Sequence, residues 1–368
     1  MASNKNQHFV PRCYLRPFTI DSANSAINIY NIDRQKFIES GPVKNQCSGD
    51  YFYGKDPLLE KAIQAMENAY GNALRVILGQ GYALIDDHRN LLKTFWLLQH
   101  LRTEAASKRA VEMNDATCAV AGLDGSRFRL EIREAVQMAM KNFTEFMGIV
   151  SDLKVCLLRN RTRTPFITSD DPAVLTNRWH IESTKAKGQS FGLQSAGDIL
   201  LLPLSPKILC LGYDGDVYSV PHHKNGWVEV RRDSDVAAFN QHQFLNCRAN
   251  LYVQDPAHSK LVHESFLRTA PRRPEGRHVI HYAMFDCSEG GFSRYRVVNR
   301  AEAGDHEKAI MHMQVVHAKP DIWPWQISWR TKAVVFTNGT GLGYVRRAWT
   351  NCYDTQPFRK EFARGKNR

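Results

Sequence analysis

Eight residues of this chain have side chains of the types used in acid–base and phosphate chemistry, and they occur at positions where such side chains are uncommon. They are His8, Arg12, Glu67, Gln99, Arg102, Ser169, Asp170 and Asp171. Several of them interrupt apolar helical stripes, where charged side chains are rare unless they are paired. Histidines and carboxylates transfer protons or bind divalent cations, and arginines pair with phosphate oxygens. Such a set would suit the hydrolysis of a phosphate ester, provided that the fold brings its members together.

Four of these residues are the candidate catalytic groups: His8, Glu67, Asp170 and Asp171. In this hypothesis the carboxylates bind a divalent cation or activate water, and His8 acts as the acid or the base. The cation would be Mg²⁺ or Mn²⁺, although the sequence identifies no metal site by itself.

Two arginines are the candidates for binding the phosphate, Arg12 near the N-terminus and Arg102 near the end of a predicted helix. Gln99 lies three residues before Arg102, so both occupy nearly the same helical face. Ser169 directly precedes the acidic pair. We expect Gln99 and Ser169 to support the groups beside them.

Each of these residues also has a structural interpretation. Glu67 and Arg102 can form a buried ion pair between two packed helices. Asp170 can cap or bend the turn before Pro172, and the residue before a proline is held in an extended conformation. His8 can be a half-buried histidine with no catalytic role. The sequence leaves these alternatives open.

Missing motifs disfavour several other chemistries. The eight cysteines lie singly along the chain, without a Cys-x-x-Cys pair, which disfavours a structural zinc site and an iron–sulfur cluster. Kinase His-Arg-Asp and Asp-Phe-Gly runs do not occur. The three glycines of 339–343 lack the Lys-Ser/Thr that closes a phosphate-binding loop, and we interpret them as a turn.

Three helices are predicted to position the polar residues of the first half. The first begins at Pro57, with Asp56 as its cap, and ends near Gly79. The second begins after 86–87 and carries Gln99 and Arg102. The third extends over 127–150 with one apolar face.

Patterns typical of strands occur before and after these helices in the sequence. The predicted strand segments are a hairpin over 26–37, two strands joined tightly over 153–160 and 165–175, and a second antiparallel unit over 198–220. The loop Ser-Asp-Asp-Pro, 169–172, follows one of them. Helical patterns return over 233–253 and 258–267. Together the elements predict an α+β fold, with a helical layer packed on a mixed or antiparallel sheet.

The linker 269–277, with two prolines and a glycine, is the best candidate for a domain boundary. It divides the chain into an α+β core domain over 1–269 and a β-rich, basic C-terminal domain over 270–368. Runs rich in Tyr, Trp and Val beyond the linker predict short strands.

The charge balance points toward polyanions. The chain has 49 Lys and Arg against 37 Asp and Glu, a net charge of +12. Its densest basic clusters are 161–164, 271–277 and the tail from Arg346. Four C-terminal aromatic residues could stack on unpaired bases, namely Trp325, Trp329, Tyr344 and Trp349. The alternative is a basic solvated surface with buried aromatic residues.

The length of 368 residues and a hydrophobic fraction of 43% allow a sizeable core. No apolar run approaches the roughly 20 residues of a spanning helix. The N-terminus has no apolar segment typical of a signal peptide. We therefore expect a cytoplasmic protein with no membrane contact.

Four motifs occur in an order that resembles the bacterial family called domain of unknown function 4238. They are HFVPRCYLRPF at 8–18, QHLRT at 99–103 after the helix with Glu67, FITSDDP at 166–172 and PLSP at 203–206. The similar region extends from Gln7 to Val253. Cys13 stands where a larger residue is expected, and Asp171 where asparagine is more usual. The resemblance implies a cytoplasmic bacterial protein and names no activity or substrate.

Our leading hypothesis is a nucleic-acid-directed hydrolase, a metal-dependent nuclease acting in defence or stress. The second is a non-enzymatic module that binds nucleic acid or an acidic partner protein. The third is a small-molecule or nucleotide site between the helical layer and the loop 169–172, with the C-terminal region serving self-association. A homo-oligomer is compatible with all three.

Overall fold

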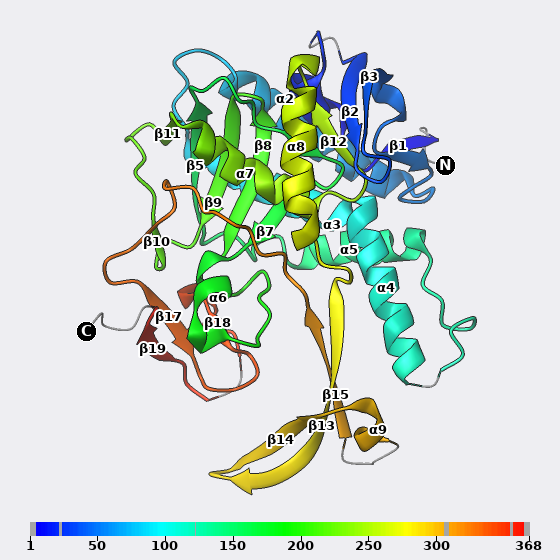
Figure 1. Ribbon diagram of the computed structural model, residues 1–368, viewed down its shortest axis with the longest axis vertical. Coiled ribbons are helices and arrows are strands. Elements are labelled where there is room, and N and C mark those ends of the chain that lie inside the picture. Colours follow the sequence, from blue (N-terminus) through cyan, green and yellow to red (C-terminus); the bar gives the residue numbers. More distant parts are fainter. Residues whose placement is uncertain (1–4, 22–23, 122, 305–308, 354–355, 364–368) are drawn as a thin grey trace.

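A computed structural model describes residues 5–21, 24–121, 123–304, 309–353 and 356–363 (Figure 1). Its helices are α1 Arg12–Leu15, α2 Pro57–Ile77, α3 Asp86–Arg102, α4 Glu104–Val120, α5 Ile132–Glu145, α6 Arg178–Glu182, α7 Asp233–Asn246, α8 Ser259–Thr269 and α9 Arg300–Ala303.

The centre of the fold is a five-stranded sheet with the strand order β11-β5-β9-β8-β7. Its strands are β5 Lys154–Asn160, β7 Val174–Thr176, β8 Ile199–Ser205, β9 Ile208–Tyr213 and β11 Trp227–Val230. β11 runs parallel to β5, whereas the other neighbours are antiparallel. The sheet is therefore mixed.

Both faces of this sheet are buried, because successive side chains of a strand point to opposite faces. On β5, Leu157 packs with the helices α2, α3 and α5. Its neighbours Cys156 and Leu158 pack on the other face, against α7 and the C-terminal region. Burial on both sides explains why β8 is an almost continuous apolar run.

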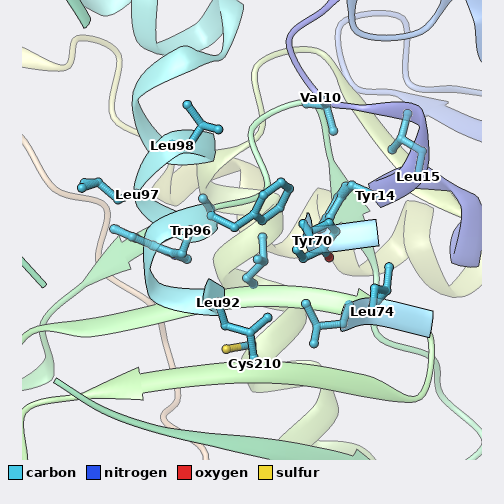
Figure 2. Close-up of a cluster of buried hydrophobic side chains, with 14 of the residues drawn as sticks. Val10, Tyr14, Leu15, Tyr70, Leu74, Leu92, Trp96, Leu97, Leu98 and Cys210 are labelled. Atoms are coloured by element: carbon cyan, nitrogen blue, oxygen red, sulfur yellow. The ribbon is translucent and has the colours of Figure 1, made fainter. Parts of the chain in front are cut away.

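The helical layer packs through aromatic and aliphatic side chains of α2 and α3, many of which Figure 2 shows between the two helices and the strand that carries Cys210. The rings of Tyr70 and Phe95 are stacked with their centroids 3.6 Å apart. Trp96 donates its indole N–H to the carbonyl oxygen of Leu201, 3.1 Å away. This bond fixes α3 directly to β8.

A second sheet has the order β3-β2-β12-β6. Its strands are β2 Ala26–Asn31, β3 Lys36–Pro42, β6 Thr168–Ser169 and β12 Asn250–Val253. Two further sheets consist of two short strands each. β1 Asn6–His8 pairs with β4 Ser48–Asp50, and β10 Tyr218–Ser219 pairs with β16 Ser328–Trp329 of the C-terminal region.

The C-terminal region forms two further three-stranded sheets. They are β14-β13-β15, with β13 His278–Glu289, β14 Phe292–Val298 and β15 Ala309–Val315, and β18-β17-β19, with β17 Val334–Thr337, β18 Tyr344–Val345 and β19 Arg359–Phe362. We call the first sheet the arm, because it extends away from the body in Figure 1. The side chains of Val297 and Met311, on opposite faces of the arm, are both exposed.

The segment after the arm returns to the body. Ile327, Ala333 and Val335 belong to the same buried cluster as Leu158. At the base of the arm, the backbone N–H of Val316 donates to the carbonyl oxygen of Arg277, 2.9 Å away. The chain therefore leaves and re-enters the body at one point.

The linker packs against the end of α7. Arg273 donates to the carbonyl oxygens of Phe244 and Cys247, and Arg277 donates to that of Leu245 at 3.0 Å. The last carbonyl groups of a helix lack partners within the helix, and cationic side chains are favourable there. These arginines are therefore C-terminal caps of α7.

The structure confirms the α+β class with a helical layer, a mixed sheet and a β-rich C-terminal region. The predicted starts at Pro57 and near 86 are confirmed, and Asp56 caps α2 by accepting the N–H of Leu58. The hairpin 26–37 is confirmed as β2 and β3, and 198–220 contains the pair β8 and β9.

Four details of the predicted elements are wrong. The helix predicted over 127–150 is shorter, because α5 extends only over Ile132–Glu145. Helix α4 was not predicted, since its apolar face is weak. The predicted helix over 233–253 ends at Asn246, and its last residues form β12, where Leu251 pairs with Ser169. β6 therefore joins β12 in the second sheet and is not a partner of β5.

Arg346 connects the C-terminal region to the body. The sequence analysis placed it at the start of a basic tail, but its side chain is buried and forms ion pairs with Asp152 at 2.8 Å and Asp198 at 2.5 Å. It also donates to the carbonyl oxygens of Ile149 and Leu193. The buried ion pairs hold this arginine away from any ligand at the surface.

We expect Arg346→Ala to lower the free energy of unfolding by about 3–5 kcal/mol, because it leaves the buried Asp198 without its cation. The neighbouring Arg347→Ala is the matched control. Arg347 pairs with Asp216 at the surface, and its loss should cost about 0–1 kcal/mol. Urea unfolding of both variants measures the difference, and equal midpoints would contradict this role of Arg346.

Candidate functional site

A pocket of about 310 Å³ lies between β1, α1 and α2, and we call it the His8 pocket. Three of the predicted site residues line it: His8, Arg12 and Glu67. The further polar residues of its lining include Asn6, Gln7, Tyr53, Glu60, Gln64 and Arg75. The fold thus brings together residues of the first motif and of the first long helix.

His8 is held in one orientation at this pocket. Its Nδ1 lies 3.1 Å from the carbonyl oxygen of Gln46, and because a carbonyl only accepts, the proton is on Nδ1. Burial lowers the pKa of His8, and the nearby Arg12 adds to this effect. At neutral pH the ring is therefore neutral, with Nε2 available as a proton acceptor.

Glu67 and Arg102 form the ion pair that the structural interpretation anticipated. The distance between Glu67 Oε1 and an Arg102 terminal nitrogen is 2.8 Å, and Arg102 is fully buried. Gln99 Oε1 accepts two further N–H groups of Arg102 at 3.1 Å, and its amide donates to the carbonyl oxygen of Phe9. Arg102 and Gln99 therefore position Glu67 and do not line the pocket.

Two exposed arginines lie at the His8 pocket. A terminal nitrogen of Arg12 donates to the carbonyl oxygen of Asn24 at 3.2 Å, and one of Arg75 donates to Asn72 at the same distance. Each guanidinium has further N–H donors. Arg75 was missed by the sequence analysis, although it lies on the same side of α2 as Glu67.

Asp170 lies outside the His8 pocket. Its carboxylate accepts the backbone N–H groups of Arg248, Ala249 and Asn250 at 2.8–3.0 Å, at the turn between α7 and β12. Burial raises the pKa of Asp170 to about 6, and these three bonds oppose the rise. The carboxylate therefore has a structural role, but at the turn 248–250 and not at the turn before Pro172 that the structural interpretation named.

Asp171 is fully buried against the start of α4. One of its oxygens accepts the hydroxyl of Thr103 at 2.8 Å, and the other pairs with Arg109 at 2.6 Å. Ser169 donates to Gln243 of α7 at 2.8 Å. The loop 169–172 therefore ties α4 and α7 to the sheet, and the negative charge of Asp171 is balanced by Arg109.

The structure thus separates the predicted carboxylates. Glu67 lines the His8 pocket, whereas Asp170 and Asp171 have structural partners elsewhere. Among the described residues, no group of three or more His, Cys, Asp and Glu side chains is arranged to hold a metal ion. Within the same residues, no helix is long and apolar enough to cross a membrane.

A second cavity, of about 240 Å³, was missed by the sequence analysis. Its lining includes three histidines, His100, His242 and His317, and two arginines, Arg109 and Arg277. We call it the three-histidine cavity. One signal was visible in the sequence: α7 carries four polar residues in a row, 240–243, inside an otherwise apolar helix that the structure buries on nearly every side.

The basic clusters identified in the sequence are largely paired. Arg161 contacts Glu229, Arg347 contacts Asp216, and Arg272 contacts Asp321. Arg364, Lys366 and Arg368 lie outside the described residues. Most of these charges are therefore already partly neutralised within the fold.

The C-terminal aromatic residues are mostly turned inward. Trp329 and Tyr344 pack against the buried cluster that contains Leu158, and Trp349 is half-buried. Trp325 is 49% exposed and could stack on a base. The buried interpretation therefore accounts for most of this set.

One pattern was overlooked in the sequence. Gly188-Gln-Ser-Phe-Gly192 has the spacing of a Gly-x-Ser-x-Gly nucleophile elbow. It lies in a loop before β8, whereas the elbow requires a strand that turns sharply into a helix. The pattern is a chance match.

We expect Asp170→Asn to lower the free energy of unfolding by about 1–3 kcal/mol, because the new amide would face a backbone N–H that is now bonded to the carboxylate. The exposed Asp115→Asn is the matched control and should change stability by about 0.5 kcal/mol or less. Thermal and urea unfolding measure both. Equal stability of the two variants would show that the three backbone bonds are dispensable.

Burial lowers the pKa of His242 to about 4. The unfolded chain has a histidine pKa near 6.5, so the neutral ring stabilises the folded protein fully only above that pH. This contribution to the free energy of unfolding is lost as the pH falls toward 4. When the pH is lowered from 7 to 5, the free energy of unfolding of His242→Phe should therefore rise by about 2 kcal/mol relative to that of the wild type. Asp170 and Asp214, whose pKa values burial raises to about 6, titrate in the opposite sense in both proteins. A pH-independent difference in urea unfolding would contradict the neutral state of His242.

The family model described as "Protein of unknown function (DUF4238)" matches residues 6–257. No curated protein and no solved structure matches the chain. The match includes the His8 pocket and the loop 169–172, and it ends before Arg277 and His317. Since it covers more than half of the chain, the protein belongs to the DUF4238 family.

Proposed function

We propose that this protein is a nucleic-acid-directed hydrolase, a bacterial nuclease of defence or stress, that acts at the His8 pocket. The observation that carries the proposal is the oriented, neutral imidazole of His8 in one pocket with Arg12 and Glu67. The net charge of +12 supports a polyanionic substrate. The eight free thiols support the cytoplasm as its location.

In the proposed reaction, Nε2 of His8 takes a proton from the attacking water while the water oxygen bonds to phosphorus. The P–O bond to the departing nucleotide breaks, and the leaving oxygen takes a proton from solvent. Arg12 and Arg75 lie where N–H donors can neutralise the phosphate oxygens. Glu67, which Arg102 holds in place, is the carboxylate of the predicted set that remains at the site. It would orient the water or bind Mg²⁺ or Mn²⁺ together with Glu60, one further carboxylate of the same pocket.

A non-enzymatic module is the second candidate. The specific observation in its favour is the ion pair between Glu67 and Arg102, which gives both residues a structural role. This candidate predicts binding of nucleic acid or an acidic protein that weakens steeply with salt and produces no cleavage.

The proposal is tested with labelled single- and double-stranded DNA and RNA, incubated with Mg²⁺, with Mn²⁺ or with chelator. We expect cleavage by the wild type and a loss of about 10²–10⁴-fold in His8→Ala, since the base is removed. His222→Ala, at an exposed loop histidine, is the matched control. Asp170→Asn should retain cleavage at a temperature at which it is folded.

Three results separate the candidates. Cleavage that His8→Ala retains would place the reaction elsewhere. Cleavage lost in Asp170→Asn, with the fold intact, would restore that carboxylate to the site. Salt-sensitive binding of the wild type without cleavage would favour the module.

A further inference from the structure

The three-histidine cavity lies where the helical layer, α7 and the base of the arm meet. His100 comes from α3, His242 from α7, and His317 from the segment directly after β15. Its residues are distinct from those of the His8 pocket, so the inference stands apart from the proposed function.

The cavity carries unbalanced positive charge. Arg109 and Arg277 line it, and none of the described residues that line it is an Asp or Glu. Asp171, which does not line the cavity, pairs with Arg109 and accepts the hydroxyl of Thr103. Burial lowers the pKa of Arg277, and the nearby Arg109 adds to this effect. Two neighbouring guanidinium groups and one carboxylate leave one positive charge without a counterion, which an anion in the cavity could neutralise.

The histidines supply unused ring nitrogens. His100 Nδ1 donates to the carbonyl oxygen of Ala173 at 3.0 Å, which leaves Nε2 free. His317 Nε2 lies 2.9 Å from the carbonyl oxygen of Phe191, so Nδ1 is its free nitrogen. His242 is 3% exposed, and among the described residues its ring has no hydrogen-bond partner. Its nitrogens are not among the fully enclosed polar atoms that lack a partner, so water or a ligand in the cavity can reach them.

We propose that the three-histidine cavity binds a small phosphorylated compound through its phosphate group. The guanidinium groups of Arg109 and Arg277 donate to the charged oxygens. A phosphate monoester has a second pKa of about 6, so around that pH much of it keeps one proton and offers a P–O–H donor to a neutral imidazole nitrogen. A fully deprotonated anion lacks that donor.

The walls and the size of the cavity define the rest of the ligand. Its lining includes the apolar side chains of Val174, Leu193 and Leu245, and the rings of Phe191 and His317 are stacked 3.5 Å apart at its edge. The volume of about 240 Å³ lies below the roughly 300–1,000 Å³ of sites for drug-sized ligands. The phosphate therefore carries a small organic group or none.

Isothermal titration of the full chain with inorganic phosphate and with ribose 5-phosphate tests the proposal, with sulfate as the comparison. We expect saturable binding of at least one phosphate compound and weaker binding of sulfate. Ribose 5-phosphate as the tighter ligand indicates a phosphorylated metabolite, and inorganic phosphate as the tighter ligand indicates free phosphate. Absence of binding by both phosphate compounds, or sulfate binding as tightly, would overturn the proposal.

His242→Phe retains the ring that packs beside Trp323 and removes both nitrogens. We expect the affinity for the phosphate compound to fall about 10–100-fold, as for a lost hydrogen bond to a charged group. Arg277→Gln should lower it as well, and His222→Phe, at an exposed histidine outside the cavity, is the matched control. Unchanged affinity in His242→Phe would overturn the assignment.

A measurement on the wild type keeps the test valid if the variants unfold. Imidazole nitrogen NMR of the protein reports the protonation and bonding of its 14 histidines. Phosphate should shift the signals of His100, His242 and His317 and leave that of His222 in place. Shifts confined to exposed histidines would also overturn the proposal.

Discussion

The buried carboxylate of Asp171 is the contact on which the arrangement of both pockets depends. It accepts the hydroxyl of Thr103 and pairs with Arg109, so it fixes the junction of α3 and α4 to the loop 169–172. Besides Thr103, three residues near the end of α3 then have different roles. Gln99 and Arg102 brace the His8 pocket, and His100 lines the three-histidine cavity. One short motif thus supports two cavities.

Much of the central fold could be predicted because its signals are local. Asp56 before Pro57 marks the start of α2, and the apolar run of β8 marks a strand buried on both faces. Contacts distant in sequence carried no such signal. That β6 pairs with β12 depends on Asp170 holding three backbone N–H groups near Asn250, which no pattern along the chain reveals.

The candidate site was predictable in its residue types and only partly in its geometry. A charged residue on an apolar helical stripe must find a partner, and this rule correctly paired Glu67 with Arg102. The same rule does not distinguish a structural pair from a catalytic one. It also could not show that Asp170 and His8 lie in separate places, or that His242 of α7 meets His317 from beyond the family match.

The arm begins and ends at a single backbone hydrogen bond, between Val316 and Arg277. Near its base the arm also contacts the body, where Gln314 donates to the carbonyl oxygen of Gly188. The rest of the segment is an excursion whose two ends are already closed, so a change in the length of its outer hairpin alters no connection within the body. Loop-closure entropy grows only slowly with length, and lengthening or shortening the hairpin of β13 and β14 would cost little. The arm is therefore the part of the chain in which relatives can diverge in size and surface while the two cavities stay intact.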